Sequence, residues 1–190
     1  LQQRTRTIAI VGNASTTAIL QAVERGRSLA EGIVEAQQLG FLEPDPELDL
    51  RGTDAAVKLA IVAGIITGRR FDPRTIACDD IRTIDLLAVR RRVRRGATTR
   101  LVGRLDHAGG LRVSYEEVSC DSILAAPCGR VVYEYGLTRD ERRLHIGSGL
   151  GAEATAAGLW ADIRALAAEA TVLAHHSPPA LRERAAEIVR

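Results

Sequence analysis

The chain has 190 residues and a net charge of +2, and 46% of its residues are hydrophobic. These values indicate a globular protein with one good core, or one domain plus an appendage. The sequence contains no signal peptide and no stretch of about 20 apolar residues, so we expect neither secretion nor a membrane span. We expect a cytoplasmic location and no membrane partner.

The first predicted elements are a strand and a helix. Residues 8–11 form a short apolar strand that ends at Gly12. Asn13 or Ser15 has the side-chain oxygen that a helix N-cap needs, which predicts a helix over residues 16–24. A strand followed directly by a capped helix therefore opens the fold.

A second helix is predicted from signals at both of its ends. Ser28, with Glu31 three residues later, is a capping-box arrangement. Apolar residues then recur at helical spacing until Gly40, which ends the pattern. An acidic loop that contains two prolines follows, over residues 43–49.

Residues 53–66 are apolar on nearly all sides and predict a buried helix. Within this helix stands Lys58, the only lysine among the 26 Lys and Arg residues of the chain. Arginine keeps its charge, whereas a lysine can be tuned to give up a proton. Asp54 lies one turn before Lys58 on the same side of the helix. A buried lysine beside carboxylates indicates proton transfer in a closed pocket; a lysine on a solvated helix face is the alternative.

A basic helix is predicted after Asp85, extending to about Arg95. It carries five arginines within residues 90–95. Such a run can contact phosphate or an acidic partner, but no aromatic residues are interleaved for base stacking. We therefore favour a solvated helix face and expect no nucleic-acid partner.

The second half of the chain is rich in predicted strands. Alternating or apolar stretches predict strands over residues 100–105, 111–118, 129–135 and 142–146. Helices and strands that come in runs argue for an α+β fold, here a mostly antiparallel sheet flanked by helices. An Ala-rich helix is expected over residues 153–170. We divide the chain into a domain of residues 1–170 and a C-terminal tail helix of residues 171–190.

Residues 147–152 satisfy the G-x-G-x-x-G/A pattern between a strand and a helix. Only 38 residues follow Ala152, so the remainder of a dinucleotide-binding fold is missing. The segment either brings backbone amides and a helix N-terminus close to a ligand or forms a tight turn. Both interpretations remain open.

We predict no metal site. Cys78, Cys120 and Cys128 share no C-x-x-C spacing and are interpreted as reduced thiols, neither disulfide-bonded nor zinc-binding. The acidic loop of residues 43–49 lacks the glycine of an EF-hand loop, which argues against calcium binding.

Four segments together resemble the homoserine dehydrogenase family. They are residues 10–20 (IVGNASTTAIL), 35–46 (EAQQLGFLEPDP), 48–61 (LDLRGTDAAVKLAI) and 147–152 (GSGLGA). The resemblance extends over residues 8–170 and implies the substrate-binding and dimerisation domain of that family. The amino-terminal Rossmann domain of the family, with its second functional lysine, has no counterpart in this sequence, and Ala14-Ser15 replaces the usual Gly-Thr.

The resemblance implies a role for each matching acidic or basic residue. Lys58 matches the catalytic lysine, which exchanges the proton of the substrate hydroxyl. Asp54 matches an acid that contacts the substrate, and Asp49 matches an acid that organises the pocket. Glu43 matches the carboxylate that holds the amino group of the substrate.

The resemblance also implies a cofactor and partners. Gly40 and Gly151 match positions whose backbone approaches NAD or NADP, a cofactor that requires further residues absent from this chain. We expect a small amino-acid substrate, homoserine or aspartate semialdehyde, and a homodimer formed through the sheet. The chain alone is expected to be inactive. The alternatives are a non-catalytic binding or scaffolding module with the same fold, and a related dehydrogenase acting on another amino or keto acid.

Overall fold

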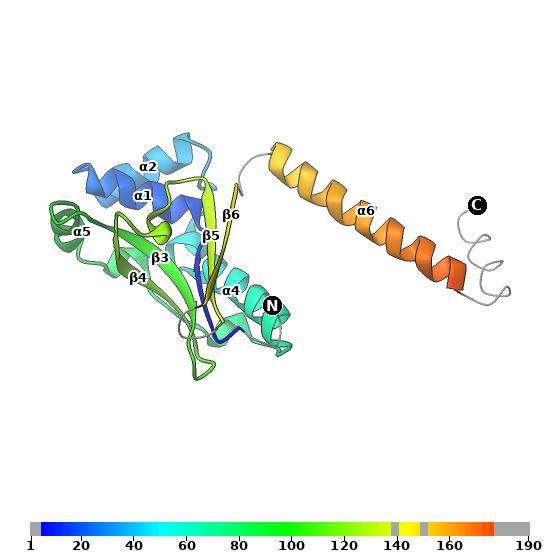
Figure 1. Cartoon of the computed structure of the whole chain (residues 1–190). Coiled ribbons are helices and arrows are strands. Elements are labelled where there is room, and N and C mark those ends of the chain that lie inside the picture. The colour runs from blue at the N-terminus through cyan, green and yellow to red at the C-terminus, as the bar shows by residue number, and fades with distance from the viewer. Residues whose placement is uncertain (1–4, 138–140, 149–151, 177–190) are drawn as a thin grey trace. The chain divides into compact units, whose positions relative to one another are not determined.

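The computed structural model describes residues 5–137, 141–148 and 152–176 (Figure 1). The chain divides into two compact units, Leu1–Gly149 and Leu150–Arg190. The described part of the second unit is one helix, α6 (Ala152–His176), and the division predicted after residue 170 falls within it. No helix of the described ranges has the length and hydropathy needed to cross a membrane.

The first unit is built on a six-stranded sheet with the strand order β2-β4-β3-β1-β5-β6. Its strands are β1 (Thr7–Val11), β2 (Ala77–Cys78), β3 (Ala97–Leu105), β4 (Leu111–Ser119), β5 (Arg130–Gly136) and β6 (Arg142–Ser148). Neighbouring strands are antiparallel except for β2 and β4, which are parallel. The α+β prediction with a mostly antiparallel sheet is confirmed, while the two-residue strand β2 was not predicted.

Strand β1 lies inside the sheet, paired with β3 on one side and β5 on the other. Its side chains alternate between two core clusters, as the period of a strand requires. Ile8 and Ile10 pack with helix α4 (Thr53–Thr67), and Ala9 and Val11 face the opposite cluster. Because β1 is hydrogen-bonded to a strand on each side, the position of Val11 is fixed, and the turn that follows it begins at a defined place in the fold.

The helices of the first unit begin at residues with capping side chains in most cases. They are α1 (Ala14–Glu24), α2 (Leu29–Gln38), α3 (Glu47–Leu50), α4 and α5 (Leu86–Val93), with 3₁₀ turns η1 (Pro73–Thr75), η2 (Ile81–Thr83) and η3 (Ile123–Ala125). Asn13 caps α1, and the predicted capping box of Ser28 and Glu31 starts α2. Asp85 caps α5 by accepting from the N–H groups of Leu87 and Ala88. Helix α3 lies where the sequence predicted only a loop.

Within the basic helix α5, Arg90 and Arg92 contact the rest of the unit, whereas Arg91 is exposed, as expected for a solvated face. Arg90 donates to the carbonyl oxygens of Gly26 and Arg27, beyond the C-terminal end of α1, at 3.3 and 2.9 Å. Arg92 pairs with Glu117 on β4 at 3.1 Å. These arginines therefore join α1 and the sheet to α5, which the prediction of a solvated face did not include.

The prediction that residues 53–66 are buried on all sides is wrong. Leu59 and Ala63 are fully buried against the sheet, whereas Val57, Ile61 and Ile65 are 39%, 56% and 62% exposed. The reason is geometric: a helix that packs on a sheet buries only the stripe that faces it. The apolar outer side of α4 faces away from the core of the unit.

Candidate active site

Lys58 and Asp54 form an ion pair at the N-terminal end of α4. Lys58 Nζ lies 2.6 Å from Asp54 Oδ2, and the two side chains are 50% and 35% exposed. The predicted pairing of Asp54 and Lys58 is confirmed. The prediction that the pair lies in a closed pocket is wrong, because half of the lysine side chain is exposed to solvent. An exposed pair at this spacing contributes only about 0.3–0.5 kcal/mol to stability. The pair is accessible to a small ligand and is not needed to hold the fold.

A second carboxylate, Asp49 of α3, is joined to Asp54 by a single amide. Asn13 Nδ2 donates to Asp49 Oδ1 at 3.1 Å and to Asp54 Oδ2 at 3.2 Å. Ser15 Oγ also donates to Asp49 Oδ1, at 2.5 Å. Three segments thus meet here: the turn between β1 and α1, the helix α3 and the start of α4.

The sequence predicted a helix-capping role for Asn13 or Ser15 and no contact of either side chain with the acids. Asp49 and Asp54, which Asn13 contacts, lie 36 and 41 positions further along the chain than Asn13. No local spacing signals such a contact, because an asparagine between a strand and a helix is fully explained by capping. Both side chains are buried, Asn13 with 4% and Ser15 with 3% of its surface exposed.

The short helix α3, which carries Asp49, is anchored from η2 by Arg82. This guanidinium contacts Glu47 Oε1 at 2.8 Å and Asp80 Oδ2 at 2.5 Å. Hydrogen bonding to Arg82 is the main cause that lowers the pKa of both Glu47 and Asp80. The ion pairs hold the loop before α4 in place around the candidate site.

The turn between α3 and α4 depends on Gly52. Its φ of +70° lies in the left-handed region, and an added Cβ would approach the carbonyl oxygen of Asp79 to 3.2 Å. Glycine alone adopts this backbone without strain. Gly52 therefore determines how Asp49, before the turn, faces Asp54, after it.

The other predicted site residues are not joined to this cluster. Glu43 is exposed, and within the described ranges no hydrogen bond or ion pair connects its carboxylate to Asp49, Asp54 or Lys58. Gly40 follows α2 with a φ of +72° and is also exposed. Gly151 lies outside the described residues.

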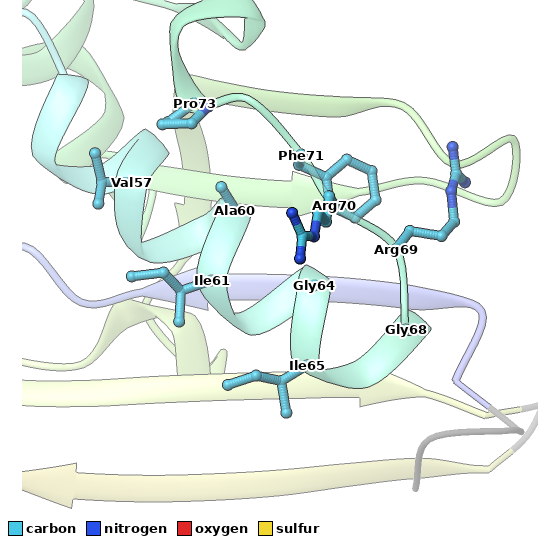
Figure 2. Close-up of a pocket in the computed structure, with 10 residues that line it drawn as sticks. All are labelled: Val57, Ala60, Ile61, Gly64, Ile65, Gly68, Arg69, Arg70, Phe71 and Pro73. Carbon is cyan, nitrogen blue, oxygen red and sulfur yellow. The ribbon is translucent and has the colours of Figure 1, made fainter.

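An apolar groove runs along the outer side of α4, away from the acids (Figure 2). It has a volume of about 540 Å³ and is lined by Val57, Ala60, Ile61, Gly64, Ile65, Gly68, Arg69, Arg70, Phe71 and Pro73. The guanidinium of Arg69 lies 5.1 Å from the centre of the Phe71 ring. Lys58, Asp54 and Asp49 are not among the residues that line this groove.

The polar groups of this site are one ammonium (Lys58), two carboxylates (Asp49 and Asp54), one amide (Asn13) and one hydroxyl (Ser15). An ammonium held by a carboxylate can exchange a proton with a ligand hydroxyl, and the half-exposed amine is open to such a ligand. In the described part of the chain, no group of three or more His, Cys, Asp and Glu side chains is arranged to hold a metal ion. The chemistry that these residues offer is proton transfer.

Comparison with known proteins identifies the family of the chain. The family model described as homoserine dehydrogenase matches residues 2–163, most of the chain. The chain belongs to the homoserine dehydrogenase family. Homoserine dehydrogenase of Synechocystis is 31% identical over 171 residues, which cover 84% of this chain and 39% of that protein.

Solved structures of the family share the fold. The homoserine dehydrogenase of Thiobacillus denitrificans superposes with a TM-score of 0.83 and 26% identity, covering 93% of this chain and 42% of that one. A hyperthermophilic archaeal homoserine dehydrogenase in complex with NADPH gives a TM-score of 0.71 and 29% identity, covering 84% and 46% of the two chains. The chain thus spans about two fifths of the length of these homoserine dehydrogenases.

Proposed function

We propose that this chain is the substrate-binding and catalytic domain of an NAD(P)-dependent homoserine dehydrogenase, which interconverts L-homoserine and L-aspartate 4-semialdehyde. The observation that carries the proposal is the placement of Lys58 Nζ, 2.6 Å from Asp54 and accessible from solvent. The match of residues 2–163 to the family supports it.

In the proposed reaction Lys58 moves the proton. Oxidation of the alcohol would remove a hydride from carbon, which NAD or NADP would accept when bound, and a proton from the hydroxyl, which must go to a base. The neutral amine of Lys58 accepts that proton and becomes an ammonium, which Asp54 stabilises by charge. Reduction of the aldehyde runs the same transfer in reverse, with Lys58 as the acid.

The acids have separate proposed roles. Asp54, which pairs with the lysine, is proposed to contact the substrate, and Asp49 is proposed to hold Asp54 in place through the amide of Asn13. Glu43 is proposed to bind the amino group of the substrate, because a carboxylate is the natural partner of an ammonium. Its side chain is exposed and therefore accessible to a ligand.

The cofactor is proposed to be held mostly by residues beyond those of this sequence. NAD or NADP supplies hydride acceptance when bound, and Gly40 and Gly151 are the positions proposed to approach it. The homoserine dehydrogenase solved with NADPH is about twice as long as the matched region, which supports a nucleotide-binding domain elsewhere.

We also propose a homodimer that forms through the edge of the sheet. Strand β6 is the last in the strand order, and its Leu144 and Ile146 are 53% and 50% exposed. An exposed apolar edge strand is a ready surface for pairing with another strand. Light scattering should give a dimer mass for the wild type and a monomer mass for Ile146→Lys; a monomeric wild type would contradict the proposal.

The catalytic proposal is tested with homoserine, NADP and a separately supplied nucleotide-binding domain of a homoserine dehydrogenase. Loss of the proton acceptor in Lys58→Ala should lower the rate of reduced-nicotinamide formation by about a hundredfold or more. Val57→Ala, a change at the preceding exposed position of α4, should have little effect. Absence of turnover in the wild type, together with unchanged homoserine binding in Lys58→Ala, would favour a non-catalytic binding module.

A further inference from the structure

We propose that Asn13 is a positioning residue: its amide holds Asp49 and Asp54 together and keeps Asp54 turned toward Lys58. The inference rests on the proposed function, and it assigns to a helix cap a part in the catalytic arrangement. It follows from the hydrogen bonds that the oxygen and the nitrogen of the buried Asn13 amide make.

The orientation of the Asn13 amide is determined by its neighbours. Its oxygen accepts from the backbone N–H of Thr16 at 3.0 Å and from Thr16 Oγ1 at 3.0 Å. A backbone N–H can only donate, so the oxygen must face α1. The nitrogen then faces Asp49 and Asp54, which as carboxylates can only accept. The flipped amide would lose the bond from the Thr16 N–H and both bonds to the acids.

The two hydrogens of the Asn13 nitrogen are divided between two acids. Nδ2 donates one hydrogen to Asp49 Oδ1, with the nitrogen and oxygen 3.1 Å apart, and the other to Asp54 Oδ2, 3.2 Å from the nitrogen. The same Asp54 oxygen contacts Lys58 Nζ at 2.6 Å. That oxygen is therefore held from two directions, by the amide and by the amine. A rotation of Asp54 away from Lys58 would break the bond to Asn13.

The cap role by itself does not require asparagine. Ser and Asp cap helices about as well as Asn, because each presents an oxygen to the first-turn N–H groups. Among these residues only Asn also carries N–H donors on the same side chain. A serine would leave both acids without this donor, and an aspartate would place a third negative charge against them. The residue type is thus set by the acids and not by the helix.

Lys58 supplies a probe that needs no turnover. Because it is the only lysine of the chain, labelling with ¹⁵N-lysine gives a single side-chain Nζ signal. Asp54→Asn removes the charge that faces the amine and marks where that signal lies without its partner. Ser28→Ala is the matched control, since it removes the cap of α2, which makes no contact with the site.

The decisive variant is Asn13→Ser, which keeps an N-cap oxygen and loses the amide donors. We expect its Lys58 signal to move toward that of Asp54→Asn, with an unfolding midpoint close to that of the wild type. With the nucleotide-binding domain supplied, kcat should fall on the order of tenfold or more, since misplacement of a catalytic group is costly. KM should change less than kcat. Ser28→Ala should leave the signal and kcat unchanged.

Asn13→Asp provides a second test if the serine variant folds poorly. It keeps the cap but reverses the interaction with the acids, so the Lys58 signal should move and kcat should fall. A Lys58 signal that stays at the wild-type position in both variants overturns the inference. If that signal moves as expected but even the wild type shows no turnover, the positioning role stands and the proposed function fails.

Discussion

Helix α4 has an inner side, represented by Leu59 and Ala63, and an outer side, represented by Ile61, Ile65 and Lys58. Both sides are mostly apolar, yet the inner residues are fully buried while Ile61 and Ile65 are 56% and 62% exposed. Apolar composition therefore does not establish burial of a helix. The outer side is where the single lysine remains accessible, and Val57, Ile61 and Ile65 of the same helix line an apolar groove (Figure 2).

The largest expected effect is a loss of stability on the inner side of α4, compared with the outer side. Leu59→Ala creates a cavity between α4 and the sheet and should lower the free energy of unfolding by about 2–5 kcal/mol. Ile61→Ala, two residues later on the outer side, should change it by less than about 0.5 kcal/mol. Urea denaturation of both variants measures the difference. Equal losses would show that the outer side is as well packed as the inner side.

The next effect concerns the turn that orients the start of α4. Gly52→Ala should cost about 1–3 kcal/mol, because alanine is strained at positive φ and its Cβ meets the Asp79 carbonyl. Gly68, at the other end of α4, has a similar φ of +69° and open space around it. Gly68→Ala should therefore cost less. Thermal unfolding that ranks Gly68→Ala as the more damaging change would argue against the close approach at Gly52.

A smaller effect is expected from the arginine that holds the loop before α4. The folded pKa values of Glu47 and Asp80 lie below their ordinary values of 4.5 and 3.8. The stabilisation is therefore fully present above about pH 5 and is lost as the pH falls through the folded pKa values. Arg82→Gln should lower stability at neutral pH, and its difference from the wild type should shrink in acid.

The control for this prediction is Arg74→Gln. Arg74 pairs with Asp72, two residues away, whereas Arg82 also reaches Glu47, 35 residues distant. Loss of the local pair should alter unfolding less than loss of the bridging arginine. Denaturation curves recorded at several pH values test both variants, and a pH-independent difference for Arg82→Gln would contradict the assignment.

The smallest effect is expected for a change of Ile65 on the outer side of α4. Ile65→Ser should leave the free energy of unfolding within about 0.5 kcal/mol of the wild type, since the side chain is already mostly in water. Chemical denaturation at low protein concentration gives this value for the chain by itself. A loss above about 1 kcal/mol would mean that Ile65 is covered in solution.

Most local elements of the first unit could be predicted because their signals are local. The capping box of Ser28 and Glu31 and the strand that ends at Val11 follow from residues within a few positions of one another. Strand β2 escaped prediction because two residues carry no periodic pattern. Its pairing with β4 depends on where the chain passes after α4.

The candidate site was predictable in its residue types and only partly in its geometry. The sequence by itself determined that Asp54 and Lys58 share one side of a helix, because their spacing is one helical turn. Only the tertiary structure decided that Lys58 stays open to solvent and that Asn13 joins Asp49 to Asp54. Contacts between distant segments depend on the position of β1 in the sheet and on the side of α4 that the sheet covers. No local pattern of residues specifies either one.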